Sequence, residues 1–277
     1  MFTPRPVHRS RLRMALGTVY FSLRRHISWR LSKTKWATHR RAPESLPVVV
    51  FEHRTPLFRP LKDVPISLQQ GKVTNLKIAL GKMDGICLAP GEVFSYWKLI
   101  GPPSARKGFV PGMALHNGIL QEEVAGGLCQ LSNLLYWMVL HTPLTVVERW
   151  RHNYDVFPDT GRTLPFGSGA TCFYNYVDLQ FANQTDQPFQ LHVYLTETHL
   201  VGQWRSDRPL PYRYQVYESH HEFRHEPWGG YTRHNELRRK VLTPGGEELE
   251  DQFITQNHAI MMYQPLLGSG DEKTGES

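Results

Sequence analysis

One cysteine opens the stretch of this chain that could carry out chemistry. Cys129 follows Gly126 and Gly127 and begins an apolar run that ends before Pro143. Apolar residues recur three and four positions apart in this run, which predicts a helix with one buried face: Leu131, Leu134, Leu135, Met138 and Val139. Free N–H groups at the first turn of a helix favour an anion and can lower the pKa of a thiol. Cys129 is therefore a candidate nucleophile.

A later segment offers a base for this thiol. Residues 144–150 alternate as a strand and lead directly into His152, Asn153 and Asp155. His152 could take the thiol proton, and Asp155 or Asn153 could orient its imidazole ring. Gln130 or the helix N–H groups could donate to a developing oxyanion. Papain-like hydrolases use the same order, with the cysteine opening a helix before the histidine, and this similarity is an analogy of layout.

The same residues also allow readings without catalysis. Many cysteines on amphipathic helices are small buried hydrophobic residues, and His152 could be a strand-end histidine packed against aromatic rings. The helix tip could instead bind an anion or a carboxylate group. The candidate ligand-binding residues are then Gly126, Gly127, Ser132 and Asn133. The sequence is thus compatible with two functions, that of an enzyme and that of a non-catalytic accessory module.

A second motif carries the spacing of a zinc site. Residues 221–225 read H-E-x-x-H, which on a helix would place two histidines on one face. Pro227 and Gly229 follow at once and exclude a long helix, while the flanking segments are typical of strands. The nearest additional ligands would be His220, Glu226 and His234. We expect a solvated polar hairpin here and predict neither a metal nor a cofactor.

Charge is concentrated at the N-terminus. Residues 1–41 hold eleven of the 32 Lys and Arg residues and no acid, which leaves 21 basic and 25 acidic residues in the remainder. This distribution argues against nucleic acid as a partner of the whole protein and favours a basic arm that meets something anionic.

Within residues 9–31, apolar side chains repeat at helical spacing between arginines: Leu12, Leu16, Val19, Leu23, Ile27 and Leu31. The pattern predicts a basic amphipathic helix, which either lies on an anionic membrane or docks on the domain behind it. The apolar patch 14–23 is too short to span a bilayer, and no small-residue cleavage site follows it. We therefore expect a cytoplasmic or membrane-peripheral protein.

The three cysteines, Cys87, Cys129 and Cys172, are too few for a disulfide framework. Cys87 and Cys172 could pair and leave Cys129 free. A reducing compartment is the simpler assumption.

The remaining pattern is α+β, with a few helices packed on a mostly antiparallel β-sheet and a smaller β-rich C-terminal unit. We expect a helix over 74–84 and strands over 46–51, 93–97, 113–121, 144–150 and 199–204. Alternation at 177–181 and 189–195 around a turn predicts a hairpin. Further short β segments follow at 212–217, 236–242, 251–254 and 260–263. The predicted units are an arm and linker (1–45), a main domain (46–208), a C-terminal extension (209–266) and a disordered tail (267–277).

Four runs of this chain carry a family resemblance: 88–97 (LAPGEVFSYW), 126–135 (GGLCQLSNLL), 141–145 (HTPLT) and 177–185 (VDLQFANQT). From about Leu46 to Asp207 the chain resembles the VanW family, which takes its name from an accessory protein of B-type vancomycin-resistance clusters. Two departures stand out, because the family often has glycine where Ala125 stands and aspartate where Gly169 stands. If that aspartate orients a base in the family, this chain lacks it or uses Asp155 or Asp178.

The resemblance implies a link to the cell envelope and to glycopeptide resistance but no settled reaction. Our sequence hypothesis is therefore cysteine-dependent acyl transfer on a small peptide or other amide of the cell envelope. The alternative is a binding module that uses the helix tip.

Overall fold

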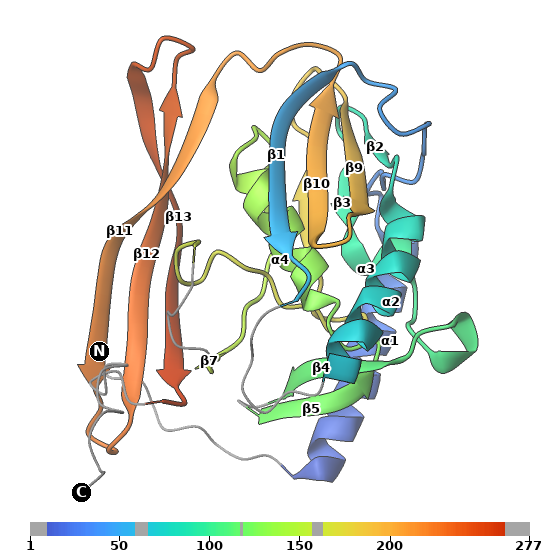
Figure 1. The fold of residues 1–277 in the computed structure, drawn as a ribbon, viewed down its shortest axis with the longest axis vertical. Helices are drawn as coiled ribbons and strands as arrows, with labels where there is room; N and C mark the ends of the chain where they lie inside the picture. Colours follow the sequence, from blue (N-terminus) through green and yellow to red (C-terminus); the bar gives the residue numbers. More distant parts are fainter. Residues whose placement is uncertain (1–9, 59–65, 117–118, 157–162, 264–277) are drawn as a thin grey trace, which may run out of the picture.

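The computed structural model describes residues 10–58, 66–116, 119–156 and 163–263. Its main sheet has four antiparallel strands in the order β1-β10-β9-β2 (Figure 1). The strands are β1 (Val48–Pro56), β10 (His199–Ser206), β9 (Phe189–Leu195) and β2 (Cys87–Leu88). Helix α4 (Cys129–Leu140) packs on β1 and β10, and helix α2 (Ile66–Met83) packs on β9. The α+β expectation is confirmed.

The core forms where α4 meets this sheet. All five apolar residues predicted for the buried face of α4 are buried, and Tyr136 and Trp137 lie in the core beside them. The contact on β10 is close, since a Cβ added to Gly202 would lie 2.5 Å from the sulfur of Met138. The amphipathic pattern alone was enough to predict this helix and the face that it buries.

A second, three-stranded sheet has the order β3-β8-β6, with β3 (Val93–Ser95), β8 (Gln180–Ala182) and β6 (Thr145–Glu148). The predicted hairpin of 177–181 with 189–195 is therefore wrong, because β8 and β9 belong to different sheets. The turn between them is held by Asn183, whose Nδ2 donates to the carbonyls of Leu88 and Gln187. These two hydrogen bonds hold the turn in which the chain passes from one sheet to the other.

Three local expectations also change. Helix α2 begins at Ile66, well before residue 74. Residues 93–97 are split, since β3 ends at Ser95 and helix α3 (Tyr96–Ile100) follows, with the Ser95 hydroxyl accepting from Lys98 N. Residues 113–121 are not one strand but parts of a hairpin, β4 (Pro111–His116) with β5 (Ile119–Val124).

The C-terminal strands form a sheet of their own, which stands beside the main body in Figure 1. Strands β11 (Arg213–His225), β12 (Tyr231–Leu242) and β13 (Glu248–Met261) pair antiparallel, and β7 (Tyr154–Asp155) pairs parallel to β13. Strands β11, β12 and β13 are longer than the segments predicted from the sequence. The polar hairpin expected around residues 221–225 is confirmed as the end of β11.

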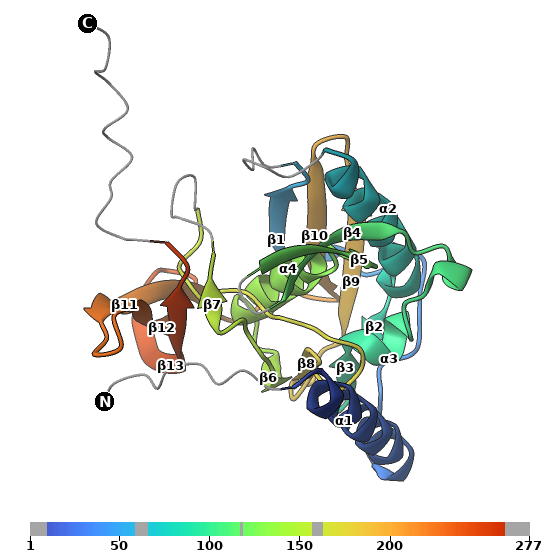
Figure 2. The ribbon, with the colours of Figure 1, turned by 90° about the horizontal axis from the view of Figure 1, so that it is seen from below.

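Helix α1 (Arg11–Leu31) precedes all of these elements and lies at the outer edge of the molecule (Figure 2). The Ser10 hydroxyl accepts from Arg13 N and caps its start. In the part of the chain that the structure describes, no helix is long and apolar enough to cross a membrane. The predicted tail, 267–277, lies outside the described residues.

Candidate functional site

The turn before Cys129 is shaped by close contacts within the protein. Gly127 has φ of +90°, and a Cβ there would lie 2.2 Å from Cγ of Lys72. A Cβ on Gly126 would lie 2.1 Å from the carbonyl oxygen of Gly112 on β4. Ala125 also has a positive φ, +66°, a backbone conformation that favours glycine. The two glycines therefore make room for other segments of the protein and do not line an empty binding site.

Cys129 is the first residue of α4 and is half-buried. The carbonyl of Leu128, which precedes it, accepts a hydrogen bond from the Tyr96 hydroxyl at 2.9 Å. The backbone N–H of Cys172 lies near the Cys129 thiol and acts to lower its pKa. Burial nevertheless raises the pKa of Cys129, so the lowering expected of a helix tip is outweighed by lost solvation. The resting group is therefore the neutral thiol.

The segment 170–172 holds the N-terminal turn of α4 in place. Ser132 Oγ donates to the carbonyl of Ala170 at 2.6 Å, and Ala170 N donates to Asn133 Oδ1 at 2.8 Å. Cys172 follows two residues later, and burial raises the pKa of its thiol well above the ordinary value. All three cysteines are free, and it is Cys172, not Cys87, that lies beside Cys129. The Cys87–Cys172 pair considered from sequence is not formed.

His152 packs against the same segment. Thr171 N donates to the carbonyl of Trp150 at 2.8 Å, which sets the two segments side by side. The half-buried His152 ring meets the Phe173 ring edge-on, with 6.4 Å between their centroids. The short segment 171–173 therefore lies near Cys129 at Cys172 and near His152 at Phe173.

The two predicted orienting residues face the C-terminal sheet. Asp155 is buried, and its Oδ2 lies 3.2 Å from Nη1 of Arg233 and accepts from the Tyr263 hydroxyl at 2.9 Å. The Asn153 carbonyl accepts from Ile260 N, while its side chain is exposed. These contacts give both residues a structural task in joining β7 to β12 and β13.

The side chain of Gln130 also has a structural task. Its Nε2 donates to Thr55 Oγ1 at 3.0 Å and to the Pro56 carbonyl at 2.9 Å, which ties α4 to the end of β1. An amide nitrogen carries two hydrogens, and both have acceptors here. An oxyanion at this helix tip would therefore be served by the backbone and not by Gln130.

The predicted ligand-binding residues are mostly enclosed. Gly126 and Ser132 are buried, and Ser132 is bonded to Ala170 as described. Asn133 is exposed but accepts the Ala170 N–H, and a Cβ on Gly169 would lie 2.4 Å from its Oδ1. An aspartate in place of Gly169 would need this contact to open.

Sequence reasoning missed the buried polar residues around the turn. Asn75 of α2 donates to the carbonyls of Val110 and Gly126 and accepts from Val110 N. Lys72, one turn earlier and also buried, donates from Nζ to the Leu57 carbonyl. The sequence pattern that could have identified them is their spacing. Lys72 and Asn75 are three residues apart, which places both on one face of a helix.

Asp178 is a further buried acid near the thiols. Its two oxygens accept from Ser95 Oγ, Trp97 N, Leu179 N and Gln180 Nε2, at 2.6 to 3.0 Å. Burial raises its pKa to about 6 despite these donors. Its place beside α3 makes it a structural anchor of the run 88–97.

The H-E-x-x-H residues lie on strand β11 and not on a helix. Residues four apart in a strand are about 13 Å apart, too far to share one ion. Among the described residues, no group of His, Cys, Asp or Glu side chains could hold a metal.

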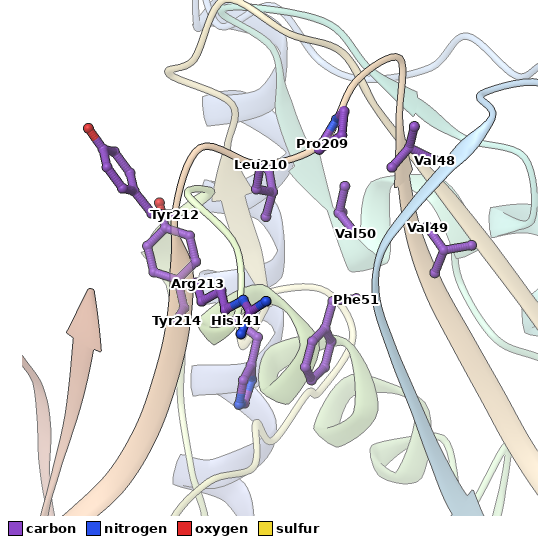
Figure 3. Close-up of a pocket in the computed structure, with 10 residues that line it drawn as sticks. All are labelled: Val48, Val49, Val50, Phe51, His141, Pro209, Leu210, Tyr212, Arg213 and Tyr214. Carbon is purple, nitrogen blue, oxygen red and sulfur yellow. The ribbon is translucent and has the colours of Figure 1, made fainter. Parts of the chain in front are cut away.

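An open pocket lies at the other end of α4, between β1 and the start of β11 (Figure 3). His141 stacks on Phe51 in this pocket, with 4.2 Å between ring centroids, and its Nδ1 lies 2.9 Å from the Trp137 carbonyl. Burial lowers the pKa of His141 to about 4. The twelve residues of α4 separate this pocket from Cys129, a distance of about 17 Å.

Comparison with known proteins places the chain in a family. The profile described as VanW like protein matches residues 71–205. The vancomycin B-type resistance protein VanW of Enterococcus faecalis is 31% identical over 228 residues, which cover 82% of each chain. The chain belongs to the VanW family. An uncharacterized protein of Bacillus subtilis, YoaR, is 30% identical over 44% of this chain and 39% of its own length.

The region that matches the VanW profile includes Lys72 and Asn75 of α2, Cys129 and Cys172. It ends before β11. No solved structure matches. The relation to a vancomycin-resistance protein confirms the family reading of the sequence and leaves the reaction open.

Proposed function

We propose that this VanW-family protein is a cysteine-dependent acyl-transfer enzyme that acts on an amide bond of a small cell-envelope peptide. Its relative from Enterococcus is named a vancomycin B-type resistance protein, which supports the substrate class. The observation that carries the proposal is the segment from Thr171 to Phe173: its Cys172 N–H lies near the Cys129 thiol, and its Phe173 ring meets the His152 ring.

The raised pKa of Cys129 decides the form of the mechanism. Because the resting thiol is neutral, a base must take its proton as the sulfur attacks. In the proposed step, the Cys129 sulfur bonds to the amide carbonyl carbon while His152 accepts the thiol proton. The C–N bond then breaks, His152 returns the proton to the leaving amine, and a thioester remains. Water or a second amine attacks that thioester and regenerates the thiol.

Backbone groups are the best candidates for stabilising the oxyanion, since Gln130 is engaged with β1. We place this chemistry in the cytoplasm, as the three free thiols favour a reducing compartment.

Iodoacetamide alkylation, read for each cysteine by mass spectrometry between pH 6 and 10, tests the pairing of Cys129 with His152. We expect Cys129 to react faster than Cys87 and Cys172, and His152→Ala to slow it at least about tenfold near pH 7.5. His220→Ala, which removes an exposed histidine of β11, is the matched control. An unchanged Cys129 rate in His152→Ala would overturn the proposed base.

A second readout tests acyl transfer itself. The protein is incubated with a digest of cell-wall stem peptides, and intact mass spectrometry searches for an acyl adduct on Cys129. The adduct should be absent in Cys129→Ala, and hydroxylamine should remove it, as expected of a thioester. If no stem peptide in the digest is cleaved or becomes attached to Cys129, the proposed enzymatic function is contradicted.

A non-catalytic accessory module is the second candidate function. The enclosed setting that raises the pKa of Cys129 and the engaged Gln130 amide favour it. In that case a carboxylate would bind at the helix tip, and Cys129→Ala would retain binding of stem peptides. This pattern together with the absence of any adduct would replace the enzyme by the binding module.

A further inference from the structure

One face of helix α1 packs on the protein. The half-buried positions on this face are Ser22, Arg25 and Trp29, three and four residues apart. Arg25 pairs with Glu148 at 2.5 Å and donates to the Tyr176 carbonyl at 3.1 Å, and the Ser22 carbonyl accepts from Asn175. Trp29 packs against the core, under the ammonium group of Lys98. The orientation of α1 is therefore set by specific contacts.

The apolar stripe of α1 lies on the opposite side and faces solvent. At 100° per residue, its positions cluster more than 90° away from the face that contacts the protein. Its six aliphatic side chains are between 47 and 78% exposed: Leu12, Leu16, Val19, Leu23, Ile27 and Leu31. They extend along a helix of 21 residues, about 30 Å. Soluble monomers rarely expose a contiguous apolar surface of this kind.

Charge narrows the choice of partner. Residues 1–41 contain no acid, and the helix has no acidic residue in its first turn. Arg13, Arg24 and Arg30 are exposed on α1, and Lys33 follows its end. An apolar stripe with cations along its edge and near its C-terminal end complements a surface that is apolar beneath an anionic layer.

The spacing argues against a second copy of the helix as the partner. A coiled-coil seam through Leu16, Val19 and Leu23 would continue at His26 and Arg30, which interrupt it after two heptads. A bilayer does not require this strict register. The helix is also too polar to cross a membrane, which leaves an orientation in the plane of the interface.

We infer that α1 docks the protein on the surface of a membrane rich in anionic lipids. The six aliphatic side chains enter the boundary between headgroups and acyl chains, the arginines contact lipid phosphates, and the folded domain stays on the aqueous side. This inference concerns location and does not depend on the proposed chemistry at Cys129.

Vesicle flotation with the full chain tests the inference. The vesicles contain phosphatidylcholine alone or with one quarter phosphatidylglycerol, at low salt and at 0.5 M NaCl. We expect binding to the anionic vesicles, weaker binding at high salt, and at least about tenfold weaker binding to neutral vesicles.

The triple variant Leu16→Ser, Val19→Ser, Leu23→Ser should weaken binding to anionic vesicles at least about tenfold. The matched control is Leu249→Ser with Phe253→Ser, two comparably exposed apolar residues on β13. Thermal unfolding confirms that both variants are folded. Equal binding of the triple variant and wild type overturns the inference. A dimer of the wild type that the triple variant breaks, measured by sedimentation without vesicles, would overturn it too and identify a second copy as the partner.

Discussion

Asp155 Oδ2 lies 3.2 Å from Nη1 of Arg233, and both side chains are almost fully buried. The pair joins β7, three residues beyond the candidate base His152, to β12 in the C-terminal sheet. The Arg233 guanidinium also lies 4.5 Å from the Phe166 ring centroid. The acid that the sequence suggested as an orienter of His152 is thus part of the contact between the two main parts of the fold.

Removing one partner of this pair should destabilise the protein strongly. Arg233→Met leaves the Asp155 charge buried, and we expect a loss of about 3–5 kcal/mol in the free energy of unfolding. The double variant with Asp155→Leu should recover a large part of that loss, because both charges of the buried ion pair are then removed together. Urea denaturation measures both. Additive losses in the double variant would show that the two side chains are not coupled.

The same variants separate a structural from an orienting role of Asp155. If Asp155 only joins the sheets, Asp155→Asn and Arg233→Met should slow the alkylation of Cys129 equally when both are folded. A markedly slower rate in Asp155→Asn alone would assign it to the orientation of His152.

The glycine turn should resist any side chain at Gly127. Gly127→Ala adds a methyl group 2.2 Å from Lys72 at a φ of +90°, so it combines backbone strain with overpacking. We expect a loss of about 2–4 kcal/mol. Gly91→Ala is the control, because Gly91 has a similar φ of +79° with nothing within 4 Å, and should lose about 1 kcal/mol. Equal losses in urea denaturation would refute the contact with Lys72.

The half-buried His141 should make the fold sensitive to acid. Its pKa is lowered to about 4 in the folded protein, while the unfolded chain binds a proton near pH 6.5. Its contribution is therefore complete above pH 6.5 and is lost as the pH falls toward 4. Relative to His141→Gln, wild type should lose on the order of 3 kcal/mol across this window. Parallel pH profiles of unfolding for the two proteins would contradict the shift.

Asp178 should act in the opposite direction. Its pKa is raised from 3.8 to about 6, so the unfolded chain releases the proton first as the pH rises. The contribution of Asp178 is greatest below pH 3.8 and declines toward pH 6, by on the order of 3 kcal/mol. The difference in unfolding free energy between wild type and Asp178→Asn, followed from pH 3.5 to 7, isolates this term. A difference that grows in favour of wild type with rising pH would have the wrong sign.

Local patterns determined the elements around the candidate site. The three-and-four spacing after Gly127 was sufficient to predict α4, its buried face and Cys129 at its tip, since helical periodicity is a property of neighbouring residues. The repeat from Leu12 to Leu31 likewise predicted α1. The sequence runs around Cys129 were sufficient to identify the VanW family.

Contacts between distant residues were decided only by the tertiary structure. Alternation predicts a strand but not its neighbour, so β8 and β9 were wrongly paired. The engagement of Gln130 with Thr55 and of Asp155 with Arg233 joins residues 75 and 78 positions apart, and no local pattern contains such pairs. The pKa of Cys129 is raised for the same reason: the helix tip is visible in the sequence, but the burial that outweighs it comes from packing. Side-chain spacing is a short-range property of the chain, whereas solvation and strand pairing depend on which distant segments the fold brings together.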